Sequence, residues 1–263
     1  GKPTPTERAA QPHRLFDLHA LGESPSAGRW ARAAAAVCED AFARGVTPVL
    51  VGGSGLYLNA LREGLHAEPP REPALRAALE AECASVGVEA MHAQLRTLDL
   101  ATAERLAPRD RQRVLRALEV VRASGHVLAW WRERPRESPL VAEWRTFQLV
   151  GEPAWSSERI ERRTREMWAS GLLDETQALV EAGHEPALRA LAAIGYDEAL
   201  ERLAGRMRAD EAERRMNERT RQLAKRQRTW FRHQSRSEPL PASVGTAPLA
   251  QRIQAAAGVS GHS

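Results

Sequence analysis

The sequence predicts an α/β protein with an all-helical insertion, and three stretches carry this prediction. "AGRWARAAAAVCEDAFARG" has the apolar spacing of a helix that ends at Gly45, and residues 48–51, "PVLV", follow it as a short buried strand. From about Pro69 to Arg134, four helical patterns follow one another without any strand-like run. "EWRTFQLVG" then alternates as a strand and returns the chain to a sheet. A helix, a short turn and a buried strand in this order indicate a parallel sheet.

The other elements complete the expected order. Residues 1–27 are rich in Pro, Gly and Ser and are expected to form a surface connection. After the second strand we expect two long helices, "SSERIERRTREMWASGLLDETQALVEAG" and "EPALRALAAIGYDEALERLAG", and then a basic helix, "ADEAERRMNERTRQLAKRQRTWFRHQ". Residues after about Ser235 are small and polar and are expected to be disordered. The predicted domains are a discontinuous α/β core at 1–66 and 135–235, a helical insertion at 67–134 and a disordered tail at 236–263.

Composition excludes several classes of protein. The 263 residues carry a formal net charge of +4, and 43% of them are hydrophobic. Cys38 and Cys83 are the only cysteines and form no C-x-x-C pair, so we expect neither a metal site with cysteine ligands nor a disulfide framework. Because no apolar stretch is long enough to span a membrane and there is no secretory signal, we expect a cytoplasmic protein. Arg supplies nearly all the positive charge. Binding to nucleic acid would explain this composition, and so would a GC-rich genome.

A glycine-rich turn lies between the first predicted strand and the next helix. Gly52, Gly53 and Gly55 allow a sharp turn and a close approach, and the helix that follows offers unpaired N–H groups to an anion or a polar substrate. Two interpretations of Ser54 stay open, because it can cap the helix with its side chain or present its hydroxyl to a ligand.

The predicted basic helix has one cationic and one apolar face. Four of its cations recur at i, i+4, i+7 and i+11 and share one face: Arg221, Lys225, Arg228 and Arg232. Two pairs seven residues apart form an apolar stripe that can dock on a core: Leu223 with Trp230, and Ala224 with Phe231. The cationic face of this helix is therefore suited to binding phosphates. The alternative interpretation is that this face is only exposed to solvent, in a protein that is rich in Arg throughout.

A second basic cluster lies in the helical insertion, at "PRDRQRVLRALEV". Asp110 can cap this helix, and Gln112, Arg113 and Arg116 lie along its first turns. Arg and Gln side chains can bind both base edges and phosphates, but Arg-rich amphipathic helices are common and the cluster is a weak signal alone.

A third cluster lies in "RIERRTREMWASGLLDE". Arg159, Arg163 and Glu166 occupy neighbouring turns of one helical face, and Gly171 ends the helix. An Arg held by packing can clamp a pyrophosphate through two hydrogen bonds. The residues alone favour the other interpretation, a Glu–Arg ladder within the helix.

Five separated segments occur together in the order and spacing of one known family. They are "PVLVGGSGLYLNAL", "QRVLRALEV", "EMWASGLLDE", "AAIGYDEAL" and "TRQLAKRQRTWFR", and "KPT…PHRLFDL" precedes them. On these segments, from about Lys2 to Arg232, the chain resembles the tRNA dimethylallyltransferases. The resemblance implies a P-loop-NTPase-like parallel sheet core with a helical insertion that grips the tRNA anticodon arm. It also implies transfer of a dimethylallyl group from dimethylallyl diphosphate to the exocyclic amine of the adenosine next to the anticodon, with that base flipped into a channel.

The resemblance also implies roles for individual residues. The turn of Gly52, Gly53 and Gly55 would line the channel, and the Ser54 hydroxyl would hydrogen-bond near the reacting amine. Arg163 would clamp the diphosphate, whose charge Mg²⁺ would help to neutralise. The implied tRNA contacts are Arg76, Gln112, Arg113, Val114, Leu115, Arg116, Ala192, Ala193, Ile194, Gly195, Tyr196, Asp197, Lys225, Arg226, Gln227, Arg228, Thr229, Trp230, Phe231 and Arg232. The expected partners are tRNA and dimethylallyl diphosphate, for a monomer that does not associate with membranes.

The chain departs from the family's pattern in three respects. Ser54 stands where the family normally has Thr, which keeps the hydroxyl and loses the methyl group. No G-x-x-x-x-G-K-[ST] sequence occurs, and the catalytic Asp that follows this loop in the family is missing too. Because the resemblance starts partway along the family's pattern, we expect an N-terminal piece of several dozen residues to be absent, with the first strand, the phosphate-binding loop and the general base.

These departures leave one alternative function open. The first hypothesis is a tRNA prenyltransferase. The alternative is a catalytically inactive remnant of this family that still binds tRNA. A prenyltransferase acting on a free adenylate would need neither the helical insertion nor the basic helix, and these two features argue against it.

Overall fold

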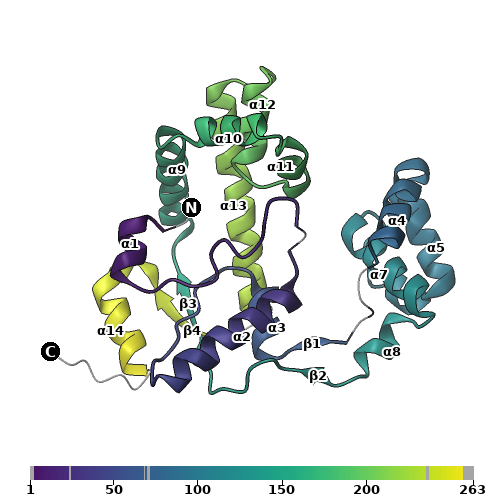
Figure 1. Ribbon diagram of the computed structural model, residues 1–263, viewed down its shortest axis with the longest axis horizontal. Coiled ribbons are helices and arrows are strands. Elements are labelled where there is room, and N and C mark those ends of the chain that lie inside the picture. The colour runs from purple at the N-terminus through teal and green to yellow at the C-terminus, as the bar shows by residue number, and fades with distance from the viewer. Residues whose placement is uncertain (1–2, 24, 68, 70–71, 235–236, 257–263) are drawn as a thin grey trace. The chain divides into compact units, whose positions relative to one another are not determined.

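The chain forms two units, each around an apolar core of its own (Figure 1). The computed structural model describes residues 3–23, 25–67, 69, 72–234 and 237–256. Residues 63–139 make up one unit, called here the helical unit, and residues 1–62 with 140–263 make up the other, called the core unit. The helical unit is therefore an insertion in the chain of the core unit.

The helical unit confirms the four helical patterns expected in this part of the sequence. They form α4 (Pro73–Val86), α5 (Val88–Leu98), α6 (Leu100–Ala103) and α7 (Arg111–Ser124), followed by the short α8 (Leu128–Arg132). The Asp110 side chain accepts a hydrogen bond of 3.2 Å from the Arg113 N–H and so caps α7, as expected. Gly125, at φ 71°, ends this helix. At the base of the unit, β1 (Leu65–His66) pairs antiparallel with β2 (Arg136–Glu137).

The core of the helical unit lies among α4, α5 and α7. Its fully buried side chains include Leu79, Met91, Leu95, Val114, Leu115 and Leu118. Removing a side chain of this size from water contributes about 1.5–3 kcal/mol, so these residues account for much of the unit's stability. Because α7 turns one apolar stripe inward, its remaining positions are left for contacts on the outside of the unit.

The core unit consists mainly of helices. They are α1 (Pro5–Ala10), α2 (Ala27–Ala43), α3 (Gly55–Arg62), α9 (Pro153–Ala169), α10 (Leu172–Glu181), α11 (Glu185–Leu191), α12 (Tyr196–Leu203), α13 (Ala209–Gln234) and α14 (Thr246–Ala256). Helix α2 presents small buried residues, among them Ala31, Ala34 and Cys38, and packs with α3 through Ala60 and Leu61. Helix α1 forms within the stretch expected to be a surface connection, because Thr4 and Glu7 cap it reciprocally.

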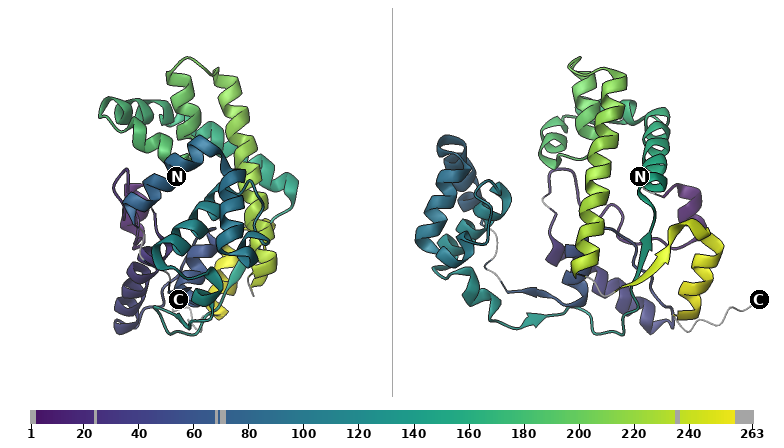
Figure 2. Two further views of the ribbon diagram at one scale, coloured as in Figure 1. Left: turned by 90° about the vertical axis from the view of Figure 1, so that its right-hand side faces the viewer. Right: turned by 180° about the vertical axis from the view of Figure 1, so that it is seen from behind.

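The longest helix, α13, joins several elements of the core unit. It packs against α9, α12 and α3, with α10–α12 near one of its ends and α3 near the other (Figures 1 and 2). Although α13 has 26 residues, neither it nor any other described helix is both long and apolar enough to cross a membrane.

The two long helical segments expected before α13 are each divided in two; the end at Gly171 agrees with the sequence analysis, and the break between α11 and α12 corrects the prediction of one continuous helix. Gly171, at φ 91°, separates α9 from α10, and Ala192 at φ 48° with Gly195 at φ 101° separates α11 from α12. A residue with positive φ cannot continue a right-handed helix, so the chain changes direction at these points.

The strand predicted at residues 143–151 is confirmed, and its partner comes from the segment expected to be disordered. β3 (Phe147–Val150) pairs parallel with β4 (Glu238–Pro241), in a register that joins Leu149 to Leu240. A short 3₁₀ turn (Ala242–Val244) and α14 follow. The prediction of disorder is wrong for these residues because Leu240 is fully buried and Leu249 nearly so, which offsets the entropy of ordering the segment. Residues 236 and 257–263 lie outside the described part.

The strand predicted at residues 48–51 is not present, which corrects that prediction. Val49 is 70% exposed and Val51 is 92% exposed, and no described strand pairs with this run. A β-branched run forms a strand only where a neighbouring strand satisfies its backbone N–H and C=O groups.

Candidate functional site

The glycine-rich turn lies directly against helix α13. A Cβ atom on Gly53 would overlap the Gln227 side-chain amide, and one on Gly55 would overlap the Trp230 ring. Around Gly52 there is open space. Two of the three glycines are therefore required because the protein's own basic helix approaches the turn closely. This contact brings residues 53–55 beside residues 227–230 of the core unit.

Ser54 is exposed at this contact, and its backbone begins α3. Its carbonyl oxygen accepts hydrogen bonds from the Tyr57 N–H at 3.1 Å and from the Leu58 N–H at 3.2 Å. Within the described part of the chain, the Ser54 hydroxyl has no hydrogen-bond partner. The side-chain cap is therefore not formed, and the hydroxyl is available to a ligand.

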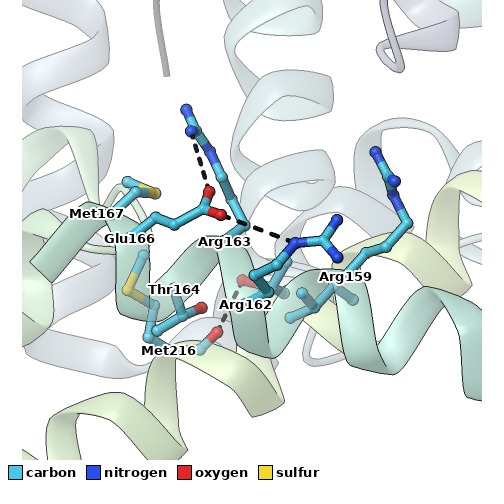
Figure 3. Close-up of a pocket in the computed structure, with 9 residues that line it drawn as sticks. Arg159, Arg162, Arg163, Thr164, Glu166, Met167 and Met216 are labelled. Carbon is cyan, nitrogen blue, oxygen red and sulfur yellow. Dashed lines mark hydrogen bonds and ion pairs between the residues drawn. The ribbon is translucent and has the colours of Figure 1, made fainter. Parts of the chain in front are cut away.

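A pocket of about 550 Å³ lies between α9 and α13 (Figure 3). Its lining comprises Arg159, Ile160, Arg162, Arg163, Thr164, Glu166, Met167, Met216 and Thr220. Three guanidinium groups from α9 line it together with the apolar side chains of Met167 and Met216 (Figure 3). No sequence pattern indicated the two methionines, because they come together only through the packing of α9 on α13.

The arginines of this pocket are only loosely paired. Glu166 lies between two of them, with its Oε2 at 3.8 Å from Arg163 Nη1 and its Oε1 at 3.7 Å from Arg162 Nε (Figure 3). The Arg163 side chain is 57% exposed, and exposed pairs of this kind contribute about 0–1 kcal/mol. The predicted Glu–Arg ladder is therefore present, but an anion that enters the pocket can compete with Glu166 for both guanidinium groups.

Among residues 221–232 of α13, one cation is paired with another helix and four have no ion pair within the described residues. Arg221 lies 3.0 Å from the Glu161 carboxylate of α9 and so joins the two helices. Four cations further along have no ion pair within the described residues: Lys225, Arg226, Arg228 and Arg232. The predicted apolar stripe is corrected, because Leu223 is 38% exposed and Gln227 with Trp230 makes the contact with the turn. An anchored helix with a free cationic end remains.

The 192–197 turn is held from inside the core unit. Arg219 of α13 contacts Asp197 at 2.8 Å and Glu198 at 2.7 Å, and it donates a hydrogen bond of 3.1 Å to the Ala192 carbonyl. The Tyr196 hydroxyl donates to Glu175 at 2.6 Å, and burial together with this bond raises the pKa of Tyr196 to about 12. The polar side chains of this turn therefore have internal partners, and Gly195 is buried.

In the helical unit, the stretch predicted to contact tRNA has two faces. Val114 and Leu115 are fully buried in the core, which corrects their assignment as contacts, because no surface of either residue can reach a ligand. Gln112 and Arg113 are exposed, and Arg113 lies 3.2 Å from Asp110. Arg116 is partly buried, in contact with Glu119. The spacing of apolar residues along α7 could have separated these two groups.

Comparison with known proteins gives consistent results. Residues 1–234 match the model of a family described as IPP transferase. The chain is 43% identical over 242 residues to a tRNA dimethylallyltransferase of Stenotrophomonas maltophilia, covering 88% of this chain and 75% of that protein. Among solved structures, a tRNA isopentenylpyrophosphate transferase of Bacillus halodurans is similar, with a TM-score of 0.65 and 30% identity over 98% of this chain and 80% of that one. A eukaryotic dimethylallyltransferase acting on tRNA, at 24% identity, has the same fold with a TM-score of 0.78, covering 98% of this chain and 67% of that one. These likenesses confirm the predicted fold class.

Proposed function

The chain belongs to the IPP transferase family, and we propose that it takes part in tRNA modification, the transfer of a dimethylallyl group from dimethylallyl diphosphate to tRNA. The acceptor is the exocyclic amine of the adenosine next to the anticodon. One observation carries the proposal: the close contact of Gly53 and Gly55 with Gln227 and Trp230 holds Ser54 against the part of α13 that carries the unpaired cations. A group that can orient an amine and a surface that can bind phosphates thus lie together.

The pocket between α9 and α13 is proposed to hold the diphosphate of the donor. In the transfer, the amine nitrogen attacks the allylic carbon, the carbon–oxygen bond breaks, and the diphosphate leaves with the bonding electrons. The guanidinium groups of Arg159, Arg162 and Arg163 would stabilise the charge that develops on the leaving oxygen. Met167 and Met216 offer an apolar wall beside these cations, which suits a substrate with an anionic head and an apolar chain.

Two parts of the family's pattern have no counterpart in this sequence. The 263 residues contain no G-x-x-x-x-G-K-[ST] loop to bind phosphate and no Asp placed after one to act as a general base. The described residues also do not fit the Mg²⁺ that the family implies. They include no group of three or more His, Cys, Asp or Glu side chains that could hold a metal, and the carboxylate of the pocket, Glu166, lies between two arginines.

The tRNA surface is proposed to include the free end of α13 and the exposed side of α7. Lys225, Arg226, Arg228 and Arg232 can each neutralise a phosphate without first breaking an ion pair. Gln112 and Arg113 are exposed at the start of α7 and can donate hydrogen bonds to phosphates or base edges. The buried, reduced thiols of Cys38 and Cys83 support a reducing cytoplasm as the place of this activity.

The test measures prenyl transfer to unmodified tRNA, together with tRNA binding at several salt concentrations, for the chain and two variants. Ser54→Ala should lower turnover by about 10²–10³, because one positioned hydrogen-bonding group is lost, and should leave the free energy of unfolding nearly unchanged. Ser54→Thr keeps the hydroxyl and should retain activity. Equal loss of activity in both variants would contradict the proposed role of the hydroxyl.

The alternative function is tRNA binding without transfer. The unpaired cations of α13 support binding of tRNA by themselves. Salt-sensitive binding of tRNA with no transfer by the 263-residue chain would select this alternative, and transfer by the chain would exclude it.

A further inference from the structure

Three side chains in and around α8 form a stacked column that has no role in the proposed function. The imidazole ring of His126 lies nearly parallel to the Trp130 indole, with 3.7 Å between the ring centroids and 10° between the planes. The guanidinium carbon of Arg134 lies 3.0 Å from the centroid of the same indole. Both groups lie too close to the middle of this ring to share one face, so Trp130 is stacked between them.

The column is fixed to the end of α7 by the hydroxyl group of Ser124. This oxygen accepts hydrogen bonds from the His126 backbone N–H at 3.2 Å and from Trp131 Nε1–H at 3.3 Å. The hydroxyl itself donates to the Val120 carbonyl at 2.7 Å. The Trp131 ring in turn packs edge-on against Trp130, with 4.7 Å between the centroids. The column is therefore ordered before any ligand arrives, which reduces the conformational entropy lost on binding.

One end of the column is open to a ligand. His126 is exposed, whereas Trp130 and Arg134 are half-buried. Within the described residues, Trp130 is the only ring that contacts the imidazole, and neither ring nitrogen of His126 has a hydrogen-bond partner. The outer face of the imidazole is therefore a flat π surface that another ring can cover.

The charges around this face suit an anionic ligand with an aromatic ring. Residues 126–136 contain three arginines and one acidic residue. Arg132, at the end of α8, is exposed and has no ion pair in the part of the chain that the structure describes. An unpaired nucleotide combines a flat base with a phosphate, and proteins that bind single-stranded RNA stack such bases on aromatic and His side chains.

We propose that the column of His126, Trp130 and Arg134 is a stacking site for an unpaired base of tRNA, with His126 in contact with the base. The inference rests on the proposed function, which names tRNA as a ligand of this chain. It adds a contact that needs no charge to a surface described so far by its cations. Because every base has a π face, this contact should show little preference for one base over another.

The test measures the Kd of the full chain for unmodified tRNA at several salt concentrations. His126→Ala should raise the Kd about five- to tenfold, which is the lower part of the range for one stacked base. The slope of log affinity against log salt should stay unchanged, because a contact with a base neutralises no phosphate. His126→Phe keeps a flat ring and should retain the affinity. The matched control, Val127→Ala, removes an exposed apolar side chain beside the column and should change neither quantity.

A fluorescent base tests the stack on the unchanged chain as well. The probe is tRNA that carries aminopurine in place of one unpaired base at a time, because stacking on a ring quenches the fluorescence of this base. Binding should quench at least one position, and His126→Ala should restore the fluorescence there while His126→Phe does not. If no position depends on His126, the inference is wrong.

Several other results would overturn the inference. His126→Ala could bind as tightly as the unchanged chain, or its salt slope could be flatter, which would identify a phosphate contact instead. Equal weakening by His126→Ala and His126→Phe would indicate a hydrogen bond from the imidazole, and loss of the fold in both, followed by circular dichroism, would indicate a structural role. A change in the sedimentation of the free chain with unchanged tRNA affinity would assign the column to contacts between protein molecules.

The outcomes also separate the inference from the proposed function. If replacement of Lys225 and Arg228 by Glu weakens tRNA binding and His126→Ala does not, only the inference fails. If the unchanged chain does not bind tRNA, the proposed function fails and the inference fails with it.

Discussion

A methyl group added to Gly55 should disturb the contact between the turn and α13. The new Cβ atom would overlap the Trp230 ring, so either the ring or the turn must move. Overpacking of this kind typically costs about 1–3 kcal/mol. Gly52 provides the matched control, because it lies in the same turn with open space around it. At Gly52, the same substitution should leave stability unchanged or raise it by about 0.4–1 kcal/mol, since Ala restricts the unfolded chain.

The assay is urea unfolding of both variants, with tRNA binding measured on the same samples. Gly55→Ala should lower the free energy of unfolding by about 1–3 kcal/mol and weaken tRNA binding, because the cationic end of α13 shifts with Trp230. A second substitution, Trp230→Leu, should recover part of the loss, and the double-mutant cycle should give a coupling of about 0.5–3 kcal/mol. Equal stability of Gly55→Ala and Gly52→Ala would show that the ring does not pack against the turn and would refute the reasoning.

Three further predictions concern the pocket, the cationic helix and pH. Arg163→Ala should raise the KM for dimethylallyl diphosphate by about tenfold or more, because one charged hydrogen bond is lost, and should leave tRNA affinity unchanged. The control, Arg165→Ala, lies outside the pocket on the same helix and should change neither quantity. Replacement of Lys225 and Arg228 by Glu should flatten the salt dependence of tRNA binding by about 1.4–1.8 units, measured by titration at four salt concentrations, and an unchanged slope would exclude them as phosphate contacts. Because the pKa of Tyr196 is raised to about 12, its contribution to stability is complete below pH 10 and is lost as the pH rises from about 10 to 12. Tyr196→Phe should remove this fall from urea unfolding curves recorded between pH 9 and pH 11.5, and a fall of the same size in the variant would assign it to other groups.

Local features of the chain were predicted well because their causes are local. Asp110 caps α7 and Gly171 ends α9, as their positions in the sequence indicate. The strands were harder to predict, because a strand forms only where a neighbouring strand satisfies its backbone groups. Residues 48–51 have the composition of a strand and no described partner, whereas β4 contains Pro239 and Pro241 and still pairs with β3.

Single residues of the candidate site could be predicted, but the contacts that bring them together could not. The roles of Ser54 and Arg163 came from the resemblance to a family, and the residues alone left a helix cap and an ion-pair ladder as alternatives. The contact of Gly55 with Trp230 joins positions far apart in the chain, so no local pattern could have shown it.

The continuity of α13 makes the number of residues in this segment as important as their identity. Met216 lines the pocket, Arg221 pairs with α9, and Gln227 with Trp230 packs against the turn, all on one unbroken helix. An α-helix turns by about 100° and rises by about 1.5 Å with each residue. A single insertion between Arg221 and Gln227 would therefore rotate everything beyond it by more than a quarter turn and carry the cations to a different side. This segment can therefore accept substitutions at its exposed positions, but it cannot accept insertions or deletions.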